Sequence, residues 1–86
     1  MAYALVPSKL FLTKLKKLDN SIVIELDEKL KDIKANPIVP ERRMHHAYNF
    51  FRAYVRNFRL IYKVEGESII LFDIIKRDED YRQFGN

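Results

Sequence analysis

The sequence predicts an α+β domain, in which a helical hairpin packs on one face of a mainly antiparallel four-stranded sheet. Two observations support this class. Apolar residues recur at helical spacing over residues 9–35, and from residue 51 they alternate with polar residues at a period of two. Residues 37–48 lie between these halves, contain two prolines and show no period, which indicates a loop. With a short strand at residues 3–6, the order is β-α-α-β-β-β in one domain covering residues 1-86.

The helical half divides into two helices. Ser8 is a good N-cap for the first helix, and the sequence Asp19-Asn20-Ser21 separates it from the second. The second helix carries the clearest apolar stripe: Ile22, Val23, Leu26, Leu30 and Ile33. It should stop before Pro37. Because the connection is about three residues long, we expect the two helices to form an antiparallel hairpin.

The strand half predicts a sheet with one apolar and one basic face. If Arg56-Asn57 form a two-residue hairpin loop, Tyr54 lies opposite Arg59, and opposite side chains share a face. The basic face then holds Arg52, Tyr54, Arg59 and Lys63. The core face holds Phe51, Ala53, Val55, Phe58, Leu60, Tyr62 and Val64. A three-residue loop would reverse one strand and separate these sets. Residues 65–67 predict the next hairpin turn, before a third strand over 68–76 that is apolar on both faces.

Charge and composition narrow the function classes. The formal net charge is +4 with a pI near 9.4, and residues 42–64 contain no acid, which permits binding to nucleic acid or to an acidic protein. The absence of cysteine excludes disulfides and thiolate metal sites. Residues 1–12 do not resemble a signal peptide, and no run is long enough to span a membrane. We therefore expect a cytoplasmic protein without a membrane partner.

The basic face allows three interpretations: a solvated sheet surface, an RNA-binding surface, or a site that cleaves RNA. Arginines hold phosphates through charge-assisted hydrogen bonds, and a tyrosine ring stacks on an unpaired base. Strand cleavage needs a 2′-hydroxyl that attacks the adjacent phosphate, proton transfers, and cations that stabilise the developing charge. The sequence offers no carboxylate cluster and no metal-ligand spacing there, so we expect no metal and no cofactor. His45 and His46 lie in the predicted loop and are interpreted as surface residues.

Three segments resemble, in order, the RelE/ParE superfamily of toxins from type II toxin–antitoxin pairs. The segment KLKKLDNSIVIELDEKLKDIKANP is similar to the family's helical hairpin. The segment FRAYVRNFRLIYKV is similar to its arginine-rich strand pair, and IILFDIIKRDEDY to its last strand followed by an arginine and a tyrosine. The resemblance covers roughly residues 2–84. It implies the RelE-like fold, a cognate antitoxin partner and, in the RelE-like branch, a ribosome-dependent endoribonuclease that cuts mRNA in the decoding site and so inhibits translation.

The resemblance also implies roles for individual residues. Arg52 would contact phosphate, Arg59 would stabilise the transition-state phosphate, and Arg77 would be a second phosphate arginine or the general acid. Tyr81 would stack on the nucleotide or assist proton transfer. Many RelE-like enzymes carry a further lysine or arginine two residues after the Arg52 position, where this chain has Tyr54.

The catalytic prediction is therefore Arg59, Arg77 and Tyr81, and the RNA-binding prediction is Arg52, Tyr54, Arg56 and Lys63. None of these is an evident general base. Two alternatives stay open. The chain could be a ParE-like toxin that poisons DNA gyrase, or a non-catalytic protein of the same fold that binds RNA or an antitoxin.

Overall fold

The computed structural model describes residues 3–44 and 47–76, with the side chains of 47–49 excepted. The elements follow the predicted order, with one short helix and one short strand added. They are β1 (Ala4–Pro7), α1 (Lys9–Leu15), α2 (Asn20–Ala35), the 3-10 helix η1 (Pro40–Arg42), β2 (Arg43–Met44), β3 (Ala47–Val55), β4 (Phe58–Glu65) and β5 (Ser68–Lys76).

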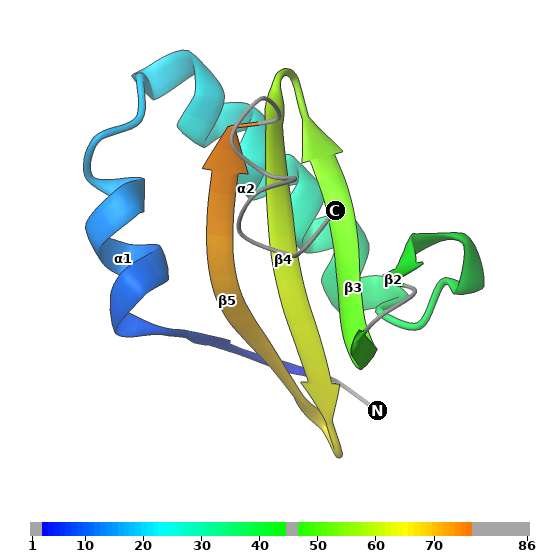
Figure 1. Cartoon of the computed structure of the whole chain (residues 1–86). Coiled ribbons are helices and arrows are strands. Elements are labelled where there is room, and N and C mark those ends of the chain that lie inside the picture. Colours follow the sequence, from blue (N-terminus) through cyan, green and yellow to red (C-terminus); the bar gives the residue numbers. More distant parts are fainter. Residues whose placement is uncertain (1–2, 45–46, 77–86) are drawn as a thin grey trace.

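The strands form one sheet in the order β1-β5-β4-β3-β2 (Figure 1). Strand β1 runs parallel to β5, and the other neighbouring pairs are antiparallel. The predicted class is confirmed, but the predicted count of four strands is wrong, since the sheet formed by the described residues has five. The additional strand β2 and the start of β3 lie in the segment that was expected to be a loop. Strand β2 has only two residues, too few to show a period in the sequence.

Helix α1 begins, and helix α2 begins and ends, where the local sequence predicts, but α1 already ends at Leu15, before the predicted break at Asp19. The Ser8 hydroxyl accepts a hydrogen bond from the Phe11 amide at 3.0 Å, so Ser8 caps α1 as expected. Helix α2 ends at Ala35, with Asn36 as its C-cap directly before Pro37. The two helices contact different strands: α1 lies beside β5, whereas α2 crosses behind the sheet and contacts β3 (Figure 1).

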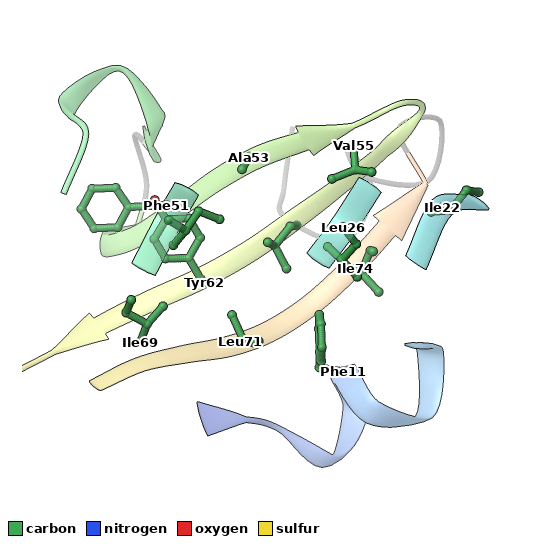
Figure 2. Packing of buried hydrophobic residues seen from close by; sticks show 12 residues of the cluster. Phe11, Ile22, Leu26, Phe51, Ala53, Val55, Tyr62, Ile69, Leu71 and Ile74 are labelled. Atoms are coloured by element: carbon green, nitrogen blue, oxygen red, sulfur yellow. The ribbon is translucent and has the colours of Figure 1, made fainter. Parts of the chain in front are cut away.

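One main hydrophobic core fills the space between the helices and the sheet (Figure 2). Phe11 from α1 and Ile22, Leu26 and Ile33 from α2 pack against the inward residues of the strands. These strand residues are Phe51, Ala53, Val55, Leu60, Tyr62, Ile69, Leu71 and Ile74, all buried. The predicted core face of β3 and β4 is confirmed, with Phe58 and Val64 partly buried at its margin.

The β3–β4 hairpin has the two-residue turn on which the face assignment depends. Val55 pairs with Phe58 and Tyr54 with Arg59, which leaves Arg56 and Asn57 in the turn. Arg56 has a positive φ of 54°, as tight hairpin turns of this length require. Arg52, Tyr54, Arg59 and Lys63 therefore share the sheet face that points away from the helices, here called the outer face.

The outer face also has a small apolar cluster. Met44, Ile61 and Ile75 are buried there, and Phe50 packs against them. These residues come from β2, β4, β5 and β3 respectively, so the cluster spans most of the sheet. The expectation that residues 68–76 bury apolar side chains on both faces is confirmed at Ile74 and Ile75.

Candidate nucleic-acid interface

Tyr54 and Arg59 contact each other on the outer face, close to the β3–β4 turn. Arg59 Nη2 donates a hydrogen bond to the Tyr54 hydroxyl at 3.1 Å. The guanidinium carbon lies 5.2 Å from the centre of the Tyr54 ring. Arg59 is only 8% exposed, whereas Tyr54 is 42% exposed. The tyrosine therefore holds the arginine in a fixed orientation and presents its own ring to solvent, where a base could stack on it.

Arg52 lies on the same face, at the edge of the sheet. It pairs with Ile61 across β3 and β4 and is partly exposed. Strand β2 pairs with β3 only at residues 47 and 51, so β3 is not covered by a strand from Arg52 onward. Beside this open edge is a groove lined by Lys29, Glu41, Arg42, Arg52, Ala53 and Tyr54.

Arg42 and Lys29 are basic residues that the sequence did not assign to the site. They come from η1 and α2, and the fold brings them to the groove that contains Arg52. Three cations and one carboxylate, Glu41, therefore line this groove, which suits an anionic ligand such as a phosphate. The run Arg42-Arg43 in an acid-free region was the available sequence signal, but it did not show which strand these arginines would approach.

Lys63 lies toward the other end of the outer face. It pairs with Phe50 across the strands, and its ammonium group is 5.6 Å from the centre of the Phe50 ring. The same ammonium group forms an ion pair with Glu65 at 2.7 Å. Glu65 is therefore a competitor that a phosphate must displace at Lys63.

Arg56 lies apart from the other predicted RNA contacts. Its Nε donates a hydrogen bond to Glu25 Oε2 of α2 at 2.7 Å, and both side chains are about half exposed. The structure thus brings Arg52, Tyr54, Arg59 and Lys63 onto one face, and places Arg56 at the hairpin turn beside α2. Arg77 and Tyr81 lie outside the described residues, as do His45 and His46.

The described part of the chain shows no metal site and no helix that could span a membrane. Within residues 3–44 and 47–76, no group of three or more His, Asp or Glu side chains comes together to hold an ion. No helix in the same ranges is long and apolar enough to cross a bilayer.

Comparison with known proteins identifies the family. Residues 5–81 match the family model described as the ParE toxin of the type II toxin–antitoxin system parDE. The chain belongs to this toxin family. It is thus a member of the RelE/ParE superfamily, as its three sequence segments indicated, and the toxin component of a toxin–antitoxin pair. No curated protein matches the sequence of this family member.

Solved structures show that this ParE-family toxin has the RelE fold. A mutant of E. coli toxin RelE in the free state superimposes with a TM-score of 0.86 at 19% identity, covering 98% of this chain and 93% of that one. A chain of the intact E. coli RelBE toxin–antitoxin complex superimposes with a TM-score of 0.82 at 22% identity, covering 87% of this chain and 96% of that one. A chain of the archaeal RelE–RelB complex from Pyrococcus horikoshii superimposes with a TM-score of 0.75 at 19% identity, covering 90% of this chain and 97% of that one.

Proposed function

We propose that this toxin binds mRNA on the outer face of its sheet and cuts it on the ribosome, and that a cognate antitoxin neutralises it. The observation that carries the proposal is the Tyr54–Arg59 pair, which combines an exposed aromatic ring with a fixed guanidinium on a basic face. Stacking on an aromatic ring and charge-assisted hydrogen bonds to phosphate are the means by which proteins hold unpaired RNA.

The chemistry follows from these groups. The 2′-oxygen of a ribose forms a bond to the adjacent phosphorus, and the bond to the 5′-oxygen of the next nucleotide breaks. The leaving oxygen takes up a proton, and a base removes the proton from the 2′-hydroxyl. Arg59 and Arg52 stabilise the negative charge on the phosphate oxygens in the transition state. From the sequence we propose that Arg77 and Tyr81 also take part in cleavage, by contacting phosphate, stacking on the nucleotide or transferring protons.

The antitoxin partner rests on the family and on its structural relatives. Several of the similar structures are complexes of a RelE toxin with its antitoxin RelB. A small basic domain with exposed apolar side chains on its helices, such as Leu10 and Ile24, suits a partner that covers both kinds of surface.

The proposal is tested by reconstituted translation with purified toxin. Primer extension on a reporter mRNA should show new 5′ ends that depend on ribosomes with the wild type, and few or none with Arg59→Gln. Lys34→Ala is the matched control, because it removes one positive charge from the exposed surface of α2. If the folded wild type produces no new ends, ribosome-dependent cleavage is contradicted.

A second candidate function is inhibition of DNA gyrase. The matching family model favours it, since that model describes the ParE toxin of parDE systems, and so does Tyr54 at a position where many RelE-like enzymes carry a basic residue. A DNA supercoiling assay with purified gyrase separates the two candidates. Inhibition of supercoiling without mRNA cleavage would replace the ribonuclease proposal.

A further inference from the structure

A β-bulge places Phe72 on the outer face, next to Phe50. Tyr62 pairs with Leu71 but Ile61 pairs with Asp73, so Phe72 is the additional residue on β5. Ser8, the N-cap of α1, contacts this bulge, because its hydroxyl donates a 2.7 Å hydrogen bond to the Phe72 carbonyl. Bulges of this kind redirect a side chain and are frequent beside functional sites.

The two phenylalanine rings form an aromatic cluster with Lys63. The ring centres of Phe50 and Phe72 are 5.4 Å apart and the rings meet edge to face at 78°. Lys63 lies 5.6 Å from the Phe50 ring. Phe72 is 38% exposed although it is a large apolar residue on an inner strand of the sheet. The cluster thus presents aromatic surface to solvent, beside an ammonium group that a phosphate can reach by displacing Glu65.

This cluster is separate from the Tyr54–Arg59 pair but lies on the same face. Along β4, Lys63 is four positions beyond Arg59, which corresponds to about 13 Å in a strand. Arg52 and Ile61 pair between these two places. The outer face therefore has an aromatic residue with a cation at each end, and a further arginine between them.

We infer that Phe50, Phe72 and Lys63 form a second RNA subsite, which stacks an unpaired base of the same strand, farther along it than the nucleotide held at Tyr54 and Arg59. The inference rests on the proposed function and extends it to a longer single-stranded substrate. Cations beside exposed rings fit a nucleic acid, whose bases stack and whose phosphates pair with Arg52 and Lys63. Residues 42–64 contain no acid, and the basic side chains that they place on this face favour an anionic ligand such as RNA over an apolar protein partner.

The subsite is tested by fluorescence anisotropy with labelled single-stranded RNA. Phe72→Leu keeps the apolar bulk but removes the ring, and Phe72→Tyr keeps the ring. Phe72→Leu should weaken binding to an octanucleotide at least about fivefold, whereas Phe72→Tyr should bind like the wild type. A dinucleotide is too short to reach both ends of the face, so its affinity should not change. Ile24→Ala, which removes exposed apolar surface from α2, is the control.

Three outcomes would overturn the inference. If the wild type and Phe72→Leu bind the octanucleotide equally, there is no second subsite, and the proposed function stands on Tyr54 and Arg59 alone. If Phe72→Leu keeps full RNA affinity but loses binding to the co-expressed antitoxin, the cluster is a protein contact. If the folded wild type does not bind the octanucleotide, the whole outer face fails as an RNA surface, and the proposed function fails with it.

Discussion

Tyr54 holds Arg59 by a hydrogen bond at 3.1 Å and by its ring, and this contact joins β3 and β4 on the outer face near their turn. The arginine is buried and the tyrosine is exposed, so the pair has a fixed cation and an accessible ring. The pair exists because the hairpin turn has two residues, which sets Tyr54 opposite Arg59. A change in that turn would separate the two side chains.

Tyr54→Phe and Arg59→Gln should affect RNA binding in different ways. Tyr54→Phe keeps the ring but removes the acceptor that orients Arg59, so affinity should fall severalfold without a change in the dependence on salt. Arg59→Gln removes a charge, and the slope of log affinity against log salt should become shallower by about 0.7 for a single strand. Anisotropy titrations at several salt concentrations measure both effects. Equal slopes for the wild type and Arg59→Gln would show that Arg59 does not contact phosphate.

Lys14→Met should destabilise the fold, because it leaves a buried carboxylate without its cation. Lys14 Nζ lies 2.8 Å from Asp73 Oδ1, and Asp73 is 3% exposed. We expect a loss of about 1–3 kcal/mol in the free energy of unfolding, measured by urea denaturation. Adding Asp73→Asn to Lys14→Met should recover part of this loss, since the amide oxygen can still accept the Ile74 amide hydrogen. An unchanged stability in Lys14→Met would contradict the ion pair.

Tyr62 should make the stability of the protein decrease at alkaline pH. Its hydroxyl donates to the Pro37 carbonyl at 2.9 Å in the core, and burial raises the pKa of Tyr62 although the Arg42 guanidinium opposes part of the rise. The folded state therefore holds this proton more tightly than the unfolded state. The stability that Tyr62 contributes in this way is complete below its unfolded-state pKa of about 10. It is lost as the pH rises through the folded-state pKa.

The variant Tyr62→Phe tests this effect. It should lower stability at neutral pH by about 1 kcal/mol, because the buried Pro37 carbonyl loses its donor. Above pH 10 the wild type should lose stability faster than the variant in denaturation curves recorded at increasing pH. If the stability of the two proteins falls in parallel above pH 10, a group other than Tyr62 titrates.

Glu25→Gln should release Arg56 for RNA binding. In the structure Arg56 is held by Glu25 of α2, so an RNA phosphate has to compete with this carboxylate. The substitution should cost less than about 1 kcal/mol of stability, because the pair is exposed. It should raise affinity for single-stranded RNA about two- to threefold if Arg56 is an RNA contact. Asp27→Asn, at the exposed Asp27–Lys31 pair on the same helix, is the charge-matched control. The Arg56 prediction is contradicted if the two variants bind RNA equally.

The sequence predicted the parts of the fold that depend on local patterns. The cap at Ser8, the end of α2 before Pro37 and the alternation in β3 and β4 all follow from residues that are near one another in the chain. The same alternation placed Arg52, Tyr54, Arg59 and Lys63 on one face. Only the assumption of a two-residue turn was needed, and the structure confirms it.

The remaining features depend on contacts between distant segments. Strand β2 has only two residues, and the bulge at Phe72 involves the pairing with β4 and the contact with Ser8, the N-cap of α1. Likewise, Arg42 and Lys29 reach the groove at Arg52 only because η1 and α2 lie beside the open edge of β3. No local period signals these contacts, so the sequence indicated neither the groove nor the Phe50–Phe72 cluster.

The central claim is that the basic outer face acts on mRNA, and induced expression in cells tests it most directly. Wild-type toxin is compared with the Arg59→Ala, Arg77→Ala double variant, and primer extension maps the 5′ ends of a reporter mRNA. We expect growth arrest with new, translation-dependent 5′ ends in the wild type and neither in the double variant. Growth arrest without new mRNA ends, or new ends that persist in a folded double variant, would contradict the account.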